Sequence, residues 1–232
     1  MKIHRNIEQN SLEWLKLRAG VVTASEMDAL VTPLGKVKEG EARKTYLLKK
    51  LAETWLGAPI EDVGAGWAAE QGHMLEAEAR DYFALATGNE VEQVAFISTD
   101  DGRCGCSPDG IIGDEGVEIK CPQVINHVRY LLDGVLPAQY VVQVQFSLWV
   151  TGFRRWHFLS YRRGFSALRM TIEPDAKIQA GITEAISQFN ELFDSGLKEL
   201  CRLNGGEPKQ RNPLLKPFPK LNPETETFDL IP

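Results

Sequence analysis

The segment from residue 107 to residue 122, SPDGIIGDEGVEIKCP, constrains the fold of this chain more than any other. Its last part alternates like a β-strand, which turns Glu118 and Lys120 to one face and Ile119 to the other, into the core. The Ser-Pro-Asp-Gly run before it favours a bend at a strand end, because proline fixes its own φ and glycine permits a sharp change of direction. Asp109 is therefore expected at this bend, facing Glu118.

Two carboxylates and a lysine in one place suit the binding of a divalent cation and the cleavage of phosphodiester bonds. Mg²⁺ prefers hard oxygen ligands, so Asp109, Glu118, the main-chain carbonyl of Ile119 and phosphate oxygens of a substrate would form a suitable shell. Lys120 is then left to orient or help deprotonate an attacking water and to offset charge in the transition state. The alternative is a β-hairpin with a surface Glu/Lys pair, since turns favour the same residues.

Helical and strand patterns alternate along the rest of the chain. Helices are predicted over residues 11–18, 41–55, 67–86, 124–132, 138–150 and 175–203, and further strands over residues 90–98, 103–106, 154–161 and 168–172. Several predicted helices end at a glycine, as helices commonly do. We therefore expect an α/β or α+β fold, in which a central mixed β-sheet is flanked by helices and carries the acids at an edge turn.

The pattern also predicts how the chain is divided. Residues 1–204 are expected to form a single domain, because 232 residues can bury one large core and no linker interrupts the first 200. After Gly205 and Gly206 the chain becomes proline-rich, and residues 205–232 are predicted to form an extended tail along the body or toward a neighbour.

A net charge of −6 looks unfavourable for DNA binding, because phosphate contacts call for Lys and Arg. The basic residues gather in short runs, such as residues 36–38 and 154–155, so a basic track on an acidic body is expected. No apolar stretch reaches the length that spans a membrane, and the N-terminal residues lack the apolar region of a signal peptide. These features favour a cytoplasmic protein without membrane contact.

Three polar side chains fall where the helical pattern favours apolar ones. Glu76 borders the apolar stripe of its helix, where a metal ion or the Lys120 ammonium would relieve the cost of burial, unless it reaches solvent or pairs with Arg80. Gln143 and Gln145 interrupt an apolar run, and each must find hydrogen bonds inside the protein or on a ligand. Structural and substrate-orienting roles are equally compatible with the glutamines.

Five motifs follow one another between residues 16 and 149: KLRAGVVTASE, GHMLEAEAR, CSPDG, EIKCP and QVQFSLW. In this order they resemble bacteriophage lambda exonuclease and the YqaJ-type viral recombinases, a family of the PD-(D/E)xK nuclease superfamily. The resemblance extends over about residues 11 to 163, and the ordered set is far more specific than the PD…ExK pattern alone.

The resemblance implies a restriction-endonuclease-like core and a Mg²⁺-dependent 5′-to-3′ double-strand DNA exonuclease, with Mn²⁺ expected to substitute. The implied metal ligands are Asp109, Glu118, the Ile119 carbonyl and Glu76, while Lys120 would be the catalytic lysine and Gln143 the active-site glutamine. The residues implied to hold the 5′-phosphate are Arg18, Ser25 and Ser107. That role suits a guanidinium beside a helix N-terminus.

The family further implies a ring-shaped homotrimer around DNA, whose 3′ overhangs pass to a single-strand annealing protein during phage-type recombination in a bacterial host. Two other functions remain open. An endonuclease would share Asp109, Glu118 and Lys120 but would not need Arg18 and Ser25, whereas an idle recombination scaffold would not need the intact acids and lysine.

The four cysteines are expected to be reduced thiols on strands rather than metal ligands. Cys104, Cys106, Cys121 and Cys201 do not form two Cys-x-x-Cys units, and structural zinc needs four ligands at suitable spacing. An iron–sulfur cluster, which some relatives of this nuclease fold carry, is kept as the minor alternative.

Overall fold

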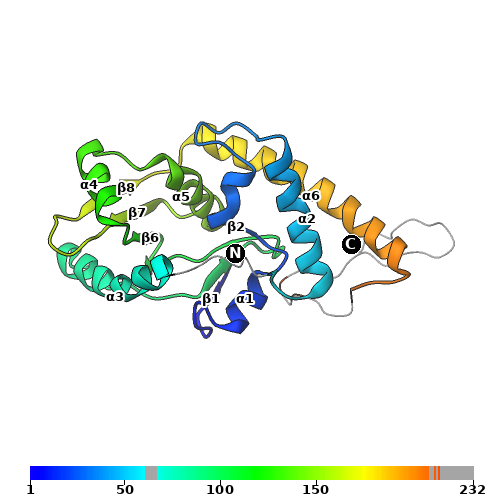
Figure 1. Cartoon of the computed structure of the whole chain (residues 1–232), viewed down its shortest axis with the longest axis horizontal. Coiled ribbons are helices and arrows are strands. Elements are labelled where there is room, and N and C mark those ends of the chain that lie inside the picture. Colours follow the sequence, from blue (N-terminus) through cyan, green and yellow to red (C-terminus); the bar gives the residue numbers. More distant parts are fainter. Residues whose placement is uncertain (61–66, 209–211, 213, 215–232) are drawn as a thin grey trace.

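The computed structural model of the chain describes residues 1–60, 67–208, 212 and 214, without the side chains of residues 67–74. Two four-stranded mixed sheets form its centre (Figure 1). The first has the order β1 (Lys2–His4), β3 (Phe96–Ser98), β4 (Cys104–Cys106) and β2 (Val22–Thr23). The second has the order β5 (Gly110–Ile112), β6 (Glu115–Lys120), β7 (Arg155–Ser160) and β8 (Leu168–Ile172).

The helices lie around these sheets, as predicted. They are α1 (Leu12–Arg18), the 3₁₀ helix η1 (Ala24–Ala29), α2 (Glu41–Leu56), α3 (Trp67–Thr87), α4 (Val124–Asp133), α5 (Ala138–Thr151) and α6 (Ala176–Asn204). The α/β class with mixed sheets and flanking helices is confirmed. The strands are divided between two sheets, however, whereas the sequence pattern suggested one central sheet.

The division occurs at residues 107–109, which carry the chain from β4 of the first sheet to β5 of the second. Pro108 has no N–H to donate to a ladder and therefore favours a break between strands at this point. The predicted strand over residues 90–98 is shorter in the structure, where β3 begins at Phe96 and Glu92 forms only an isolated bridge with Ile111.

Two helices cover opposite faces of the second sheet. Ala79 and Phe83 of α3 pack on Val117 and Ile119 of β6. Side chains alternate between the faces of a strand, so Glu118 and Lys120 point to the other face, toward α5. The predicted orientation of the strand is thus confirmed, and it leaves a carboxylate and an ammonium beneath α5.

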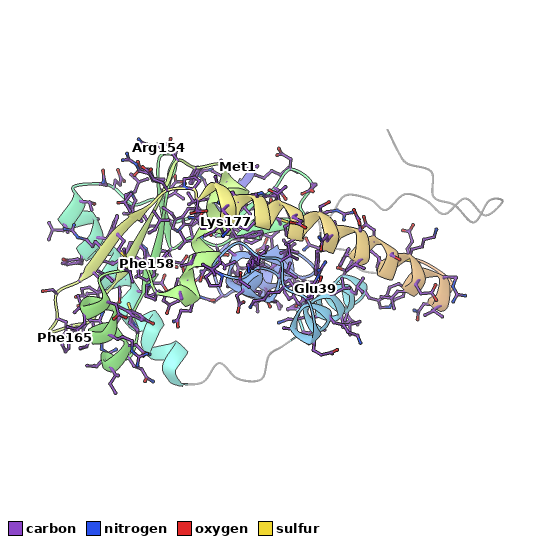
Figure 2. All side chains as sticks on the ribbon, turned by 90° about the horizontal axis from the view of Figure 1, so that it is seen from above. Met1, Glu39, Arg154, Phe158, Phe165 and Lys177 are labelled. Atoms are coloured by element: carbon purple, nitrogen blue, oxygen red, sulfur yellow. The ribbon has the colours of Figure 1, made fainter. Side chains whose placement is uncertain are left out.

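The largest core cluster joins the first sheet to α2, α5 and α6. The apolar stripe of α6 lies in this cluster through Ile182, Ile186, Phe189 and Phe193. Seen from above, α6 begins near Lys177 and continues alongside α2 (Figure 2). Among the described residues, no helix is both long and apolar enough to cross a membrane.

Most of the predicted tail, residues 205–232, lies outside the described residues, so its extended form remains a prediction, as does the division at residue 204. Residues 205–208, 212 and 214 of the tail are described, and Asn212 and Leu214 contact the body. The side-chain amide of Asn212, which is 3% exposed, donates to the carbonyls of Leu17 at 2.8 Å and Ala19 at 2.7 Å. Leu214 packs against the cluster that contains Leu17 and Phe96. Asn212 and Leu214 therefore hold the turn after α1, although they lie far along the sequence from it.

Candidate active site

Glu118 lies at the centre of the predicted catalytic group and is 3% exposed. Lys120 Nζ lies 2.5 Å from Glu118 Oε1, and Gln143 Nε2 donates to the same oxygen at 2.6 Å. The Lys120 ammonium also lies 5.3 Å from the centroid of the Tyr140 ring, in a cation–π contact. Strand β6 and helix α5 thus bring together three of the side chains that the sequence singled out.

Asp109 joins this group from the bend between the two sheets. Its Oδ2 accepts a hydrogen bond of 2.5 Å from the Ile119 N–H, and its own N–H donates to the Val117 carbonyl at 3.0 Å. The aspartate therefore continues the pairing of β6 beyond the end of β5, with its side chain in place of a strand. This contact explains why a Pro-Asp-Gly bend and a Glu-x-Lys strand work as one unit.

The main-chain carbonyl of Ile119 faces the same side as Asp109. The next carbonyl, that of Lys120, accepts from the Tyr161 N–H at 2.9 Å and therefore points toward β7. Successive carbonyls of a strand point to opposite sides, so the Ile119 carbonyl points away from β7. The Ile119 N–H points to that same side, where it donates to Asp109. The Ile119 carbonyl therefore lies on the side of the strand where Asp109 is held.

Glu76 approaches the group from α3 but is engaged elsewhere. Its Oε1 accepts from Arg80 Nη2 at 2.8 Å, the ion pair that the sequence left as an alternative. Arg80 Nε also donates to the main-chain carbonyl of Asp109 at 3.0 Å. Arg80 therefore links the helix carboxylate to the bend, a connection that the sequence pattern did not reveal.

The charges of the group shift two pKa values in the same direction. Burial and the neighbouring Glu118 carboxylate, with a smaller effect of Glu76, raise the pKa of Asp109 well above its ordinary value despite the Lys120 cation. Burial disfavours the Lys120 ammonium, but Glu118 and Asp109 outweigh it and raise its pKa. Ionising Asp109 beside Glu118 is therefore unfavourable in this group as it stands, and a bound cation would favour the ionised carboxylate.

The residues present fit Mg²⁺ with a sparse set of protein ligands. Within the described part of the chain, no three His, Cys, Asp or Glu side chains lie together as a ready metal cluster. Asp109, Glu118 and the Ile119 carbonyl offer hard oxygens within one short stretch of chain. Mg²⁺ usually keeps several waters and takes only one or two carboxylates, so this donor set suits it.

A second group of polar side chains lies beside the bend, where α1, η1 and β4 meet. Arg18 Nη2 donates to Ser25 Oγ at 3.2 Å, and the guanidinium lies 4.0 Å from the centroid of the Trp14 ring. Trp14 Nε1 in turn donates to Ser107 Oγ at 3.1 Å. The structure thus connects the three residues assigned to the 5′-phosphate, and Trp14 is the link that the sequence reasoning missed.

We call the group of Arg18, Ser25, Ser107 and Trp14 the Arg18 pocket. Arg18 is its cation and is partly buried. Burial lowers its pKa from the ordinary value, against the opposing influence of Glu26, Tyr46 and Glu53. An arginine remains protonated under any ordinary condition. A guanidinium and two hydroxyls therefore lie together here, beside the buried ring of Trp14.

The other polar residues that the sequence singled out have structural partners. Gln145 Oε1 accepts from the Asp175 N–H at 2.9 Å, and its Nε2 donates to the Glu173 carbonyl at 2.9 Å, so this glutamine joins α5 to the start of α6. Cys104 and Cys106 are buried on β4, and burial raises the pKa of both thiols. Burial likewise raises the pKa of Cys121 to about 11.

Several known proteins resemble this chain in sequence or in fold. Residues 13–154 match the YqaJ-like viral recombinase domain. ExoD of Escherichia coli strain K12 is 33% identical to the chain over 80 residues, which cover 32% of this chain and 90% of ExoD.

Solved structures of two proteins share the fold. The alkaline exonuclease LHK-Exo from Laribacter hongkongensis has a TM-score of 0.75 and 26% identity, over 84% of this chain and 98% of LHK-Exo. The same enzyme has also been solved in complex with dAMP. A phage-related exonuclease from Haemophilus somnus 129PT has a TM-score of 0.57 and 13% identity, over 78% of this chain and 96% of its own, and shows the fold alone.

Proposed function

Because the chain belongs to the YqaJ-like viral recombinase family, we propose that it is a Mg²⁺-dependent exonuclease that degrades one strand of duplex DNA from its 5′ end. The remaining 3′ overhang would then serve recombination by strand annealing. The likeness to LHK-Exo, an exonuclease that binds dAMP, supports DNA as the substrate.

One observation carries the proposal. Ser107 of the cation-bearing pocket and Asp109 of the acidic group lie on the same bend, with only Pro108 between them. An end phosphate held at the pocket would be kept a short and fixed distance from the acidic group. Such positioning favours cleavage of the bond next to a chain end over attack within a duplex, by a proximity effect.

The roles of the acidic group follow from its contacts. Asp109, Glu118 and the Ile119 carbonyl would hold Mg²⁺ or Mn²⁺, and Glu76 would complete the acidic environment. The bound ion would supply Lewis-acid activation of the phosphate and of water. The Lys120 ammonium, held by Glu118, offsets negative charge that develops on the phosphate, and Gln143 keeps the Glu118 carboxylate in place.

The roles of the pocket concern binding rather than chemistry. Arg18 would donate to the terminal 5′-phosphate, and Ser25 and Ser107 would add hydroxyl donors. A ring-shaped homotrimer, a single-strand annealing partner and action in the cytoplasm of a bacterial host are further parts of the proposal, and the family resemblance carries them.

The test is an assay on linear duplexes labelled at either 5′ or 3′ ends, with and without Mg²⁺. We expect Mg²⁺-dependent release from the 5′ end, a strong preference for a 5′-phosphate over a 5′-hydroxyl, and no attack on closed circular DNA. Arg18→Ala should lose the preference while still degrading DNA slowly, whereas the control Arg202→Ala, on the exposed end of α6, should keep it.

Each competing function gives a different result. Cleavage of closed circles would indicate an endonuclease, and DNA binding without turnover would indicate a scaffold. A full preference for the 5′-phosphate in Arg18→Ala would place the phosphate site elsewhere.

A further inference from the structure

A buried cluster of charged side chains lies next to Arg18 and is not part of the pocket itself. Helix α2 contributes Lys49, Lys50 and Glu53, and η1 contributes Glu26. Lys50 Nζ lies 2.9 Å from Glu26 and 3.0 Å from Glu53, while Lys49 Nζ lies 3.0 Å from Glu26. Lys50 and Glu53 are only 2% and 3% exposed, so water screens these two charges weakly, whereas Lys49 and Glu26 are half-buried.

The cluster is attached to the two chain segments that carry Arg18 and Ser25. Glu53 Oε2 accepts from the Gly20 N–H at 2.9 Å, two residues after Arg18. Glu26 directly follows Ser25, and its Oε2 accepts from Thr23 Oγ1 at 2.9 Å. A change in the charge of the cluster is therefore expected to affect Arg18 and Ser25, which are hydrogen-bonded to each other.

Helix α2 also packs closely against the turn after α1. Gly20 has a φ of +76°, and a Cβ at this position would lie 2.2 Å from Thr54 Oγ1. The turn therefore has little room to move away from the cluster. The distances between Arg18 and the carboxylates are set by packing as well as by charge.

The balance of charge explains how Arg18 stays available to an anion. The pocket and the cluster together contain the cations Arg18, Lys49 and Lys50 and the carboxylates Glu26 and Glu53, so one positive charge is in excess. Both carboxylates act electrostatically on Arg18. The two lysines lower the pKa of Glu26 to about 2 despite burial, so Glu26 is ionised and already satisfied by them.

We propose that Lys50 is a positioning residue for the 5′-phosphate pocket, whose charge neutralises Glu26 and Glu53 and so leaves the positive charge of Arg18 to the phosphate. The inference rests on the proposed function, because it takes the Arg18 pocket as the site of the 5′-phosphate. It assigns the strength of end recognition to residues that do not touch the DNA.

The test measures the dissociation constants of short duplexes that carry a 5′-phosphate or a 5′-hydroxyl, in the absence of divalent ions, so that no cleavage occurs. The constant for the hydroxyl divided by the constant for the phosphate gives the ratio that measures the preference for the phosphate. In Lys50→Met this ratio should fall about tenfold, because one buried positive charge is lost. In Glu53→Gln the ratio should rise, because one negative charge is lost. The double variant Glu53→Gln/Lys50→Met should return to the parent ratio.

Lys177→Met, which removes a charge from an exposed position on α6, is the control and should leave the ratio unchanged. If the role of the cluster were merely structural, the ratio would instead fall in both Lys50→Met and Glu53→Gln. That result, in a parent that prefers the phosphate, overturns this inference alone. A parent without any preference overturns the pocket of the proposed function, and this inference with it.

Stability does not decide the outcome. If Lys50→Met fails to fold, the direction of the change in Glu53→Gln is sufficient, because a rise supports the charge balance and a fall contradicts it.

Discussion

The acidic group and the Arg18 pocket are two partly buried charge clusters on either side of one bend, and they carry opposite surpluses. Around Glu118, two carboxyl groups outnumber the Lys120 ammonium, and burial together with Glu118 raises the pKa of Asp109. Around Arg18, cations outnumber the carboxylates, and the pKa of Glu26 is lowered. The first surplus suits a metal ion, whereas the second suits a phosphate.

The two clusters also differ in how the chain builds them. The acidic group draws Asp109, Glu118 and Lys120 from one hairpin of twelve residues, counted from Asp109 to Lys120. The pocket and its supporting lysines come from α1, η1, β4 and α2. A local site depends on strand alternation, whereas a distributed site depends on the packing of several elements.

The largest expected effect comes from the acidic group. Asp109→Asn, Glu118→Gln and Lys120→Ala should each lower kcat by about 10² to 10³-fold, because the acids would hold the metal and the lysine acts mainly in the transition state. DNA binding at the pocket should persist, and can be measured by fluorescence anisotropy with a 5′-phosphorylated duplex. Asp114→Asn, an exposed acid of the same hairpin, is the matched control. Near-normal turnover in any of the three variants would contradict the assignment.

A smaller effect is expected on the free energy of unfolding at acidic pH, and it should come from Glu26, beside the Arg18 pocket. Glu26 has a pKa of about 2 in the folded chain against about 4.5 ordinarily, so its contribution to stability is complete above pH 4.5 and is lost as the pH falls toward 2. By pH 3 this carboxylate alone should cost about 2 kcal/mol of the free energy of unfolding.

Urea denaturation at several pH values, in the parent and in Glu26→Gln, measures this contribution. The variant should be less stable at neutral pH and should lose less stability on acidification than the parent. Equal losses in both proteins would show that Glu26 is not held ionised by Lys49 and Lys50.

The smallest expected effect concerns Gln143. Its side-chain amide donates to Glu118 Oε1 at 2.6 Å but is not itself a charged member of the group. Gln143→Leu should lower kcat about tenfold, through a less well-held carboxylate, and should leave binding of the 5′-phosphate unchanged. Gln139→Leu, on the exposed side of the same helix, is the control. A loss of phosphate binding in Gln143→Leu would mean that the two clusters are not separable.

The sequence predicted the local site well, because its geometry follows from short-range rules. Strand alternation alone placed Glu118 and Lys120 on one face and Ile119 in the core, as the structure has them. Helix ends were also predictable, since Gly57 and Gly152 adopt the left-handed conformation that closes a helix.

The distributed features were not predictable in the same way. Nothing in the periodicity of α2 shows that Lys50 turns inward to meet Glu26, which lies 24 residues earlier. No sequence motif marks Trp14, yet its indole N–H donates to Ser107 and its ring lies against Arg18. Arg80 was named only as a possible partner of Glu76, and its contact with the Asp109 carbonyl depends on how α3 packs. Such contacts appear only after the elements are placed in three dimensions.

The contact of Asn212 has a consequence for the order in which the protein matures. The carbonyls of Leu17 and Ala19, next to Arg18, receive hydrogen bonds from a residue almost two hundred positions later, whose side chain is buried. During synthesis, the N-terminal helix leaves the ribosome long before this partner exists, and buried carbonyls without partners are costly. We therefore expect the Arg18 pocket to be completed after the acidic hairpin, because its supporting carbonyls gain their partner only once residue 212 has left the ribosome.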